Sequence, residues 1–196
     1  MHKLLSLLSP LLAATAGCGD CIPVDLTAAE RAWVAAYQPG QQVTFRSNRG
    51  ATNTLTVQPL KEWHTNQDCN QLESGKYQPI RVTLALLSAT NYGGPEHPSF
   101  SLVVDKTDPE RAATLSFNLA GLLGDKSDVP GGPVFKLLPA PVTLSSGRRF
   151  PQAYAIRNGQ NAIYLRGSQL RAAYWDQQAG LVRYELTSGE VFDLAN

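Results

Sequence analysis

The chain has three cysteines and three histidines, and the spacing of these residues limits the redox, nucleophilic and metal chemistry that it could perform. Cys18-Gly19-Asp20-Cys21 spells CxxC, a spacing associated with thiol–disulfide exchange. Exchange requires a thiolate at the first cysteine, and the sequence shows no strand pattern before the motif. We therefore expect a different role for Cys18.

The segment before Cys18 has the plan of a secretory signal peptide. His2 and Lys3 form a short positive region, and an apolar run from Leu4 to Ala16 follows. The run is shorter than the roughly 20 apolar residues of a membrane span. Residues 15–18, Thr-Ala-Gly-Cys, resemble a bacterial lipobox. That resemblance implies removal of residues 1–17 and diacylglycerol on the Cys18 sulfur; the alternative is an ordinary signal peptide cut at or near Ala16.

Lipidation of Cys18 would leave Cys21 and Cys69 as the remaining cysteines. An even pair in an oxidising compartment predicts one disulfide between them. Metal binding is a second possibility, because four potential ligands lie close together in sequence: Glu62, His64, Asp68 and Cys69. Since Cys69 is expected in the disulfide, we predict no metal site, and nothing in the sequence indicates a cofactor.

Hydrolytic chemistry has one candidate residue and no motif. The sequence contains no GxSxG, GxGxxG, P-loop, HExxH or EF-hand pattern. His97 lies between Glu96 and Pro98 in a Gly/Pro-containing loop over residues 88–98, where function often resides. Residue types without geometry are weak evidence for catalysis, so no catalytic residue is assigned.

Three aromatic residues are candidates for contact with a ligand: Trp63, Tyr92 and Trp175. Such rings can stack on sugars or line an apolar cleft, and they can equally cover a sheet or close a core. Tyr174 and Trp175 are neighbours in an expected strand, so they should point to opposite faces. At least one of them should therefore meet a loop, another layer or solvent.

One helix and several strands must position these residues. A capping box at Thr27-Ala28-Ala29-Glu30 and a stop at Pro39-Gly40 predict a helix over residues 27–37, with an apolar stripe of Leu26, Trp33, Val34 and Tyr37. Alternation predicts strands at 42–46, 54–57, 80–86, 100–104 and 114–119, the first two forming a hairpin. Residues 59–76 are expected to form an irregular loop.

The last third of the chain is typical of a meander of short strands, expected at 142–144, 152–157, 162–166, 170–175, 181–186 and 191–194. Asn158-Gly159 predicts a tight hairpin. Residues 144–150 and 186–192 share the pattern L-[ST]-S-G-x-x-F, which we interpret as one kind of turn used twice. The Gly/Pro-containing residues 120–133 are expected to cross between sheets or to mark a boundary within the domain.

These patterns predict a mainly β protein, an antiparallel meander, sandwich or open barrel with one N-terminal helix, in which residues 18–196 form a single β-rich domain. The chain has 17 Lys and Arg and 16 Asp and Glu. Because Lys3 leaves with the signal peptide, the mature net charge is zero with neutral histidines. We therefore expect no nucleic acid as a partner.

The C-terminal part adds a second resemblance. It contains Tyr174-Trp175, the strand Gly180-Leu181-Val182-Arg183-Tyr184-Glu185, and Gly189-Glu190-Val191-Phe192. With the lipobox, this ending resembles small lipoproteins of Bacteroidota-type bacteria. The group offers no catalytic residue to carry over.

Three functions follow as hypotheses. The first is a non-enzymatic lipoprotein of the cell envelope, held at a periplasmic or outer-membrane face by lipid, that binds a partner or assists assembly. The partner would be an envelope protein or an apolar or glycan ligand. The second is a carrier of an apolar ligand in a half-open barrel. The third is a hydrolase, which would need a nucleophile and His97, or two carboxylates, in one cleft.

Overall fold

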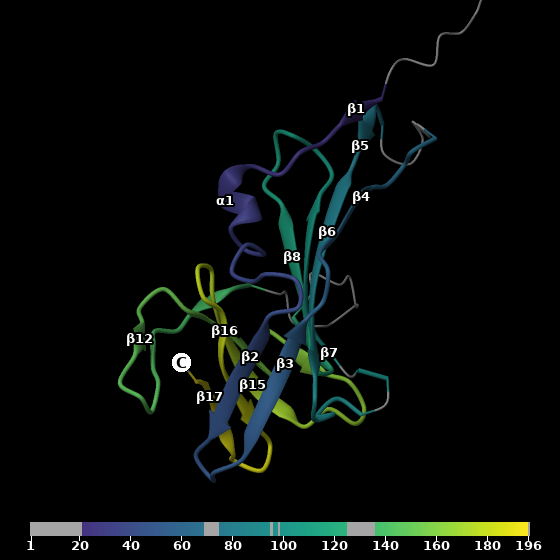
Figure 1. Ribbon diagram of the computed structural model, residues 1–196. Coiled ribbons are helices and arrows are strands. Elements are labelled where there is room, and N and C mark those ends of the chain that lie inside the picture. The colour runs from purple at the N-terminus through teal and green to yellow at the C-terminus, as the bar shows by residue number, and fades with distance from the viewer. Residues whose placement is uncertain (1–20, 69–74, 95, 98, 125–135, 196) are drawn as a thin grey trace, which may run out of the picture.

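Figure 1 shows a computed structural model of the chain, which describes residues 21–68, 75–94, 96–97, 99–124 and 136–195. Thirteen of the seventeen strands in these residues belong to one antiparallel sheet that curls into a half-barrel (Figure 1). The described residues contain a single short helix, α1 (Ala28–Arg31), near the N-terminal end of the described chain. The predicted fold class, mainly antiparallel β with an open barrel and one N-terminal helix, is confirmed.

The large sheet follows one continuous path. Its order is β10 (Leu138–Pro139), β13 (Tyr154–Arg157), β15 (Leu170–Asp176), β16 (Gly180–Leu186), β17 (Val191–Leu194), β2 (Gln42–Ser47), β3 (Thr52–Val57), β6 (Ile80–Ser88), β7 (Ser99–Lys106), β8 (Thr114–Leu119), β9 (Leu122–Gly124) and β14 (Ile163–Tyr164). Strand β4 (Lys61–His64) pairs with the start of β6. Because β9 also contacts β13 and β15, strands near the two ends of the path come together.

Two small pairs complete the structure. Strand β1 (Ile22–Pro23) runs parallel to β5 (Tyr77–Gln78), and β11 (Val142–Thr143) forms a hairpin with β12 (Arg149–Phe150). In the described part of the chain, no helix has the length and apolarity required to cross a bilayer.

The main hydrophobic core fills the inner face of the curled sheet. Strand alternation places every second side chain there, as in Val43 and Phe45 of β2, which are at most 5% exposed. At its centre the Tyr184 ring stacks on Phe192 with centroids 4.7 Å apart, and the rings of Phe45 and Phe100 lie 5.3 Å from it. Aromatic pairs of this kind contribute about 0.5–1.5 kcal/mol each beyond their buried area.

A second, smaller core lies on the outer face of β13, β15 and β16. The hairpin β11–β12 packs there, so that its Val142 and Phe150 belong to one cluster with Ala155, Ala172 and Val182. Tyr174 belongs to this outer core and Trp175 to the inner one, which confirms that the two neighbours point to opposite faces.

The predicted helix over residues 27–37 is too long, although its start is right. The capping box of Thr27 and Glu30 is formed, but α1 ends at Arg31. The following residues are joined by bonds three residues apart, from Trp33 N to Glu30 O and from Val34 N to Arg31 O. These tight turns still bury Val34 and Tyr37. A longer helix is therefore not required to bury these two residues of the apolar stripe.

Three further expectations are corrected. The stretch 59–76 is not wholly irregular, since Lys61–His64 forms β4. Residues 122–124 form β9, so the connection predicted over 120–133 is partly strand; residues 125–135 lie outside the described residues. Gly159 does form a turn at φ +75, but β13 before it pairs with β15 while β14 after it pairs with β9. The predicted tight hairpin is therefore wrong.

The repeated turn is confirmed at both copies. Leu144 N donates to Arg148 O at 2.9 Å and Leu186 N donates to Glu190 O at 2.8 Å. The turn glycines, Gly147 and Gly189, have φ of +86 and +80, which glycine adopts without steric cost. The same local sequence therefore closes two hairpins, β11–β12 and β16–β17.

Candidate anion-binding site

The three aromatic residues chosen from the sequence lie apart. Trp63 is 39% exposed and lines a shallow hollow of about 510 Å³ with Arg81 and Asp105. Tyr92 packs against the core, 5.6 Å from the Phe192 ring. Trp175 is fully buried, edge-on to Tyr37 and Phe117, and its indole Nε1 has no hydrogen-bond partner in the described part of the chain. The structure therefore does not bring them into one site.

Of the three cysteines, only Cys21 lies within the described residues. Cys21 is disulfide-bonded, and the bond from Ile22 N to Lys76 O, 2.8 Å long, holds the adjacent backbone against β5. Cys18 and Cys69 lie outside the described residues. The lipidation of Cys18 and the pairing of Cys21 with Cys69 remain predictions.

Two other candidate ligands of the 62–69 stretch, Glu62 and His64, have separate partners. Glu62 forms a two-pronged ion pair with Arg31 at 2.8 Å, which joins β4 to α1. His64 Nε2 lies 3.1 Å from Val24 O. Among the described residues, no group of three or more His, Cys, Asp or Glu is close enough to hold a metal ion.

His97 lies near a serine that the sequence does not single out. A Cβ built on Gly121 would stand 3.4 Å from Ser168 Oγ and 3.6 Å from His97 Cδ2. Ser168 Oγ accepts a bond from Leu170 N at 3.3 Å. Within the described residues no hydrogen bond joins the His97 and Ser168 side chains.

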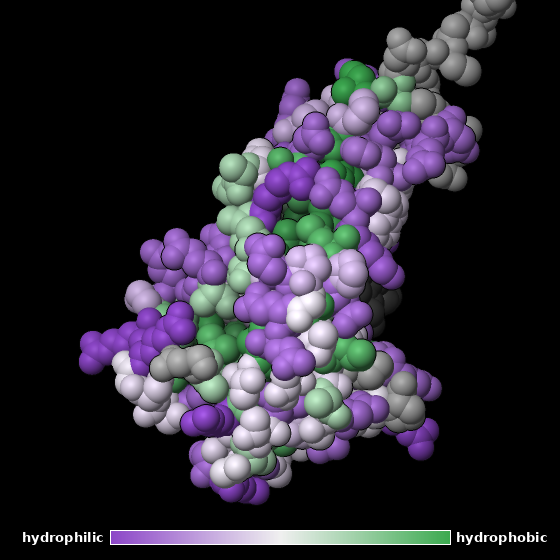
Figure 2. All heavy atoms as spheres, in the orientation of Figure 1, coloured by the Kyte–Doolittle hydropathy of each residue, from purple (hydrophilic) through white to green (hydrophobic). Residues whose placement is uncertain are grey.

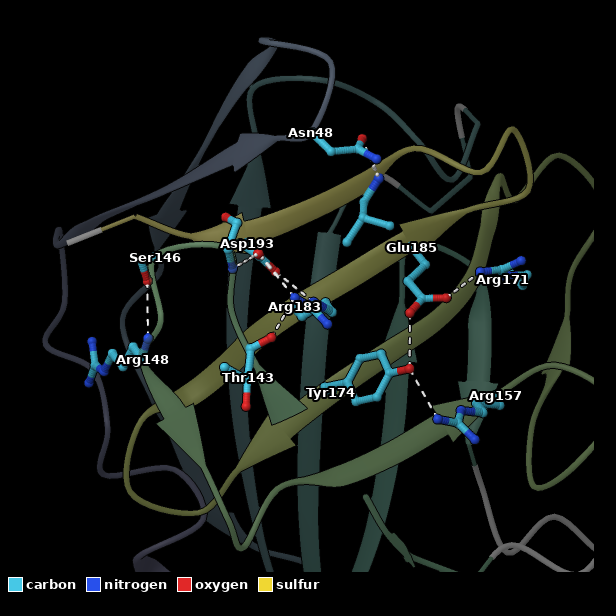
Figure 3. A network of polar contacts seen from close by, with 12 residues as sticks. Asn48, Thr143, Ser146, Arg148, Arg157, Arg171, Tyr174, Arg183, Glu185 and Asp193 are labelled. Atoms are coloured by element: carbon cyan, nitrogen blue, oxygen red, sulfur yellow. Dashed lines mark hydrogen bonds and ion pairs between the residues drawn. The ribbon is translucent and has the colours of Figure 1, made fainter. Parts of the chain in front are cut away.

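A network of polar contacts lies on the outer face of the sheet (Figure 3). One cluster is closed by the hairpin β11–β12. Arg183 of β16 donates to both carboxylate oxygens of Asp193 at 2.6 and 3.0 Å and to Thr143 O at 3.0 Å, and Ser145 N donates to Asp193 at 2.7 Å. Burial alone would raise the pKa of Asp193, but the bonds from Arg183 and Ser145 hold it below its usual value. This cluster fastens the hairpin to the sheet.

The second cluster is an open chain of four side chains (Figure 3). Arg157 Nη2 donates to the Tyr174 hydroxyl at 3.1 Å, and this hydroxyl donates to Glu185 Oε1 at 2.9 Å. Arg171 Nη2 donates to the other Glu185 oxygen at 2.5 Å. The bond to Glu185 raises the pKa of Arg171 above its ordinary value. Both Glu185 oxygens are thus occupied, and Arg157 is also held over the Tyr174 ring, 5.4 Å from its centroid.

The register of the strands creates a pocket beside these four hydrogen-bonded side chains. Arg157 of β13 lies opposite Ala172 of β15, and Ala172 lies opposite Glu185 of β16. A small residue therefore separates two long ones in a row across three strands. The resulting pocket of about 360 Å³ is lined by Arg157, Asn158, Gln160, Arg171, Ala172, Tyr174 and Glu185, and its volume lies in the range of small-ligand sites.

A β-bulge brings Arg171 to this face. The register of β15 and β16 shifts between Leu170 and Ala172, so Leu170 points into the inner core while Ala172 joins the outer one. A bulge of this kind re-aims a side chain. Arg171 is the extra residue, and its side chain is 58% exposed.

The charges of the pocket do not cancel. Two guanidinium groups face one carboxylate, which gives a net charge of +1 at neutral pH. Arg171 is paired with Glu185, and Arg157 takes part in no ion pair within the described residues. A half-buried arginine that is held in place without a counter-ion is prepared to bind an anion.

Sequence reasoning did not identify these four residues. Arg157, Arg171, Tyr174 and Glu185 lie on three strands, and the bonded pairs are separated by 11 to 17 residues. The only available signal was the expectation that Tyr174 and Trp175 point to opposite faces of the sheet. Comparison of the chain with protein-family models, curated proteins and solved structures found no match, so function is argued from the site.

Proposed function

We propose that this protein is a non-enzymatic binding lipoprotein of the cell envelope, attached through Cys18, that holds an anionic ligand in the pocket of Arg157, Tyr174, Glu185 and Arg171. The observation that carries the proposal is Arg157, which is fixed by the Tyr174 hydroxyl and ring and has no counter-ion among the described residues. The lipid would supply retention, and the pocket would supply recognition.

The inner face of the sheet gives less support to carriage of an apolar ligand. Figure 2 shows apolar side chains at the bottom of a hollow bordered by hydrophilic ones near α1. The inner face, however, is filled by bulky buried side chains, including Trp175, Tyr184, Phe100 and Phe117. An apolar ligand inside would have to displace these rings, so the outer pocket is the better candidate.

The proposal is tested by titration calorimetry with sodium glucuronate and with glucose 6-phosphate at low ionic strength, where charge interactions are least screened. We expect binding of at least one of the two anions. Arg157→Gln should weaken it about 10- to 100-fold, since a hydrogen bond to a charged group contributes about 1.5–3 kcal/mol.

The matched control is Arg111→Gln, which makes the same change of charge in the turn between β7 and β8. This variant should bind as the wild type does. Absence of binding for both anions, or equal binding by the wild type and Arg157→Gln, would contradict the proposed function.

A further inference from the structure

The free donors of Arg157 have a geometry that selects among anions. A guanidinium carries five N–H donors in one plane. One of them is used by the Tyr174 hydroxyl, so one complete edge of the fork remains. Two parallel N–H groups on such an edge match the two oxygens of a carboxylate.

The charge of the pocket favours a single negative charge. Glu185 stays within the pocket lining, and both of its oxygens already accept bonds. These bonds leave it fewer lone pairs for a ligand, and its charge repels further negative charge. A carboxylate would neutralise the net charge of +1, whereas the second charge of a phosphate monoester would find no cation of its own.

The rest of the lining suits hydroxyl groups. Asn158 and Gln160 also line the pocket, and a side-chain amide can both donate and accept hydrogen bonds. The Tyr174 ring is only 7% exposed and has Arg157 over its face, so it offers no surface on which a neutral sugar could stack. Recognition must come from charge and hydrogen bonds.

We infer that the ligand of this pocket is a sugar that carries a carboxylate, a unit of the uronic-acid type, with its carboxylate on Arg157 and its hydroxyls on Asn158 and Gln160. This inference rests on the proposed function and names its ligand class.

The test compares four probes by titration calorimetry: glucuronate, its neutral amide glucuronamide, glucose, and glucose 6-phosphate. Glucuronate should bind at least tenfold more tightly than glucuronamide or glucose, and more tightly than glucose 6-phosphate. Tighter binding of glucose 6-phosphate, with loss in Arg157→Gln, would overturn the inference and leave the proposed function standing. Binding of neither anion would remove both.

A fifth probe, acetyl-glycyl-glycine, separates a sugar acid from the carboxyl end of a peptide. If this peptide binds more tightly than glucuronate, the sugar part of the inference is wrong. If it binds at least several-fold more weakly, the hydroxyl contacts are supported.

Two variants test the geometry without relying on loss of charge. Arg157→Lys keeps the charge but removes the planar fork of N–H donors, and should weaken glucuronate binding at least fivefold. Unchanged affinity would contradict the two-pronged contact.

Ala172→Leu fills the floor of the pocket without changing its charge, and should abolish binding while the thermal unfolding transition is retained. If Ala172→Leu does not fold, Arg157→Lys and the probe series still decide the inference.

Discussion

Gly180 and Tyr37 show how closely single residues are fitted in this protein. Gly180 has φ +76, and a Cβ built on it would stand 2.3 Å from the Tyr37 hydroxyl oxygen and 2.4 Å from two ring carbons. The Tyr37 hydroxyl accepts a bond from Leu181 N at 2.8 Å, and its ring lies edge-on to Trp175. Burial raises the pKa of Tyr37, so the phenol stays neutral.

We predict that Gly180→Ala lowers the free energy of unfolding by about 2–4 kcal/mol, because it combines a positive φ with an overpacked core. Gly189→Ala is the matched control. Gly189 has φ +80 and only a guanidinium nitrogen of Arg49 near its Cβ position, at 3.9 Å, so it should cost about 1 kcal/mol. Denaturant unfolding measures both, and equal losses would show that the Tyr37 contact is not limiting.

Helix α1 depends on polar anchors, because none of its own residues is buried. Glu30 accepts bonds from Thr27 N at 2.8 Å, Ala113 N at 2.9 Å and Lys106 Nζ at 3.0 Å. Burial raises the pKa of Glu30, but these bonds outweigh it and lower the pKa from 4.5 to about 2. The Lys106 side chain is 4% exposed, so Glu30 also supplies the counter-charge of a buried cation.

An acidic group whose pKa is lower in the folded state than in the unfolded state stabilises the fold at pH values above the unfolded-state pKa. This stabilisation is lost as the pH falls through the folded-state pKa. The contribution of Glu30 should therefore be complete above pH 4.5 and disappear as the pH falls to about 2. We expect up to about 3 kcal/mol from this shift. In unfolding titrations, Glu30→Gln should be less stable than the wild type at neutral pH, with the gap closing through this window.

Glu62→Gln serves as the control for that titration. The pKa of Glu62 is also lowered, by its bond to Arg31, but the pair is exposed, and such pairs contribute at most about 1 kcal/mol. Its curve should stay close to that of the wild type. A gap between Glu30→Gln and the wild type that does not change between pH 5 and pH 2 would show that Glu30 does not titrate as described.

At the level of strands, local patterns predicted pairing well where strands run without interruption. Residues 42–47 and 52–57 form the expected hairpin, and β6, β7 and β8 follow their alternating apolar residues. The pattern was insufficient where a turn signal did not choose a partner. The chain turns at Asn158-Gly159, but in the curled sheet the strand after the turn, β14, pairs with β9 and not with β13.

At the scale of the whole molecule, the expected signal peptide, lipid and disulfide lead to one prediction on the intact protein. We expect the envelope form to have the mass of residues 18–196 with diacylglycerol attached, and no titratable thiol in denaturant without reductant. The bonded state of Cys21 supports the second part. Mass spectrometry and thiol titration measure these together. A mature chain without lipid would contradict the anchor, and two free thiols would contradict the disulfide.

The sequence by itself determined the β-rich class, the inner-face residues of most strands and the turns at 144–150 and 186–192, because alternation and turn chemistry act between near neighbours. It did not determine the outer pocket. The row of Arg157, Ala172 and Glu185 exists only once three strands are in register, and Arg171 faces the pocket only because a bulge interrupts the alternation. Only the tertiary structure could decide that these charges converge and that Arg157 is left without a counter-ion within the described residues.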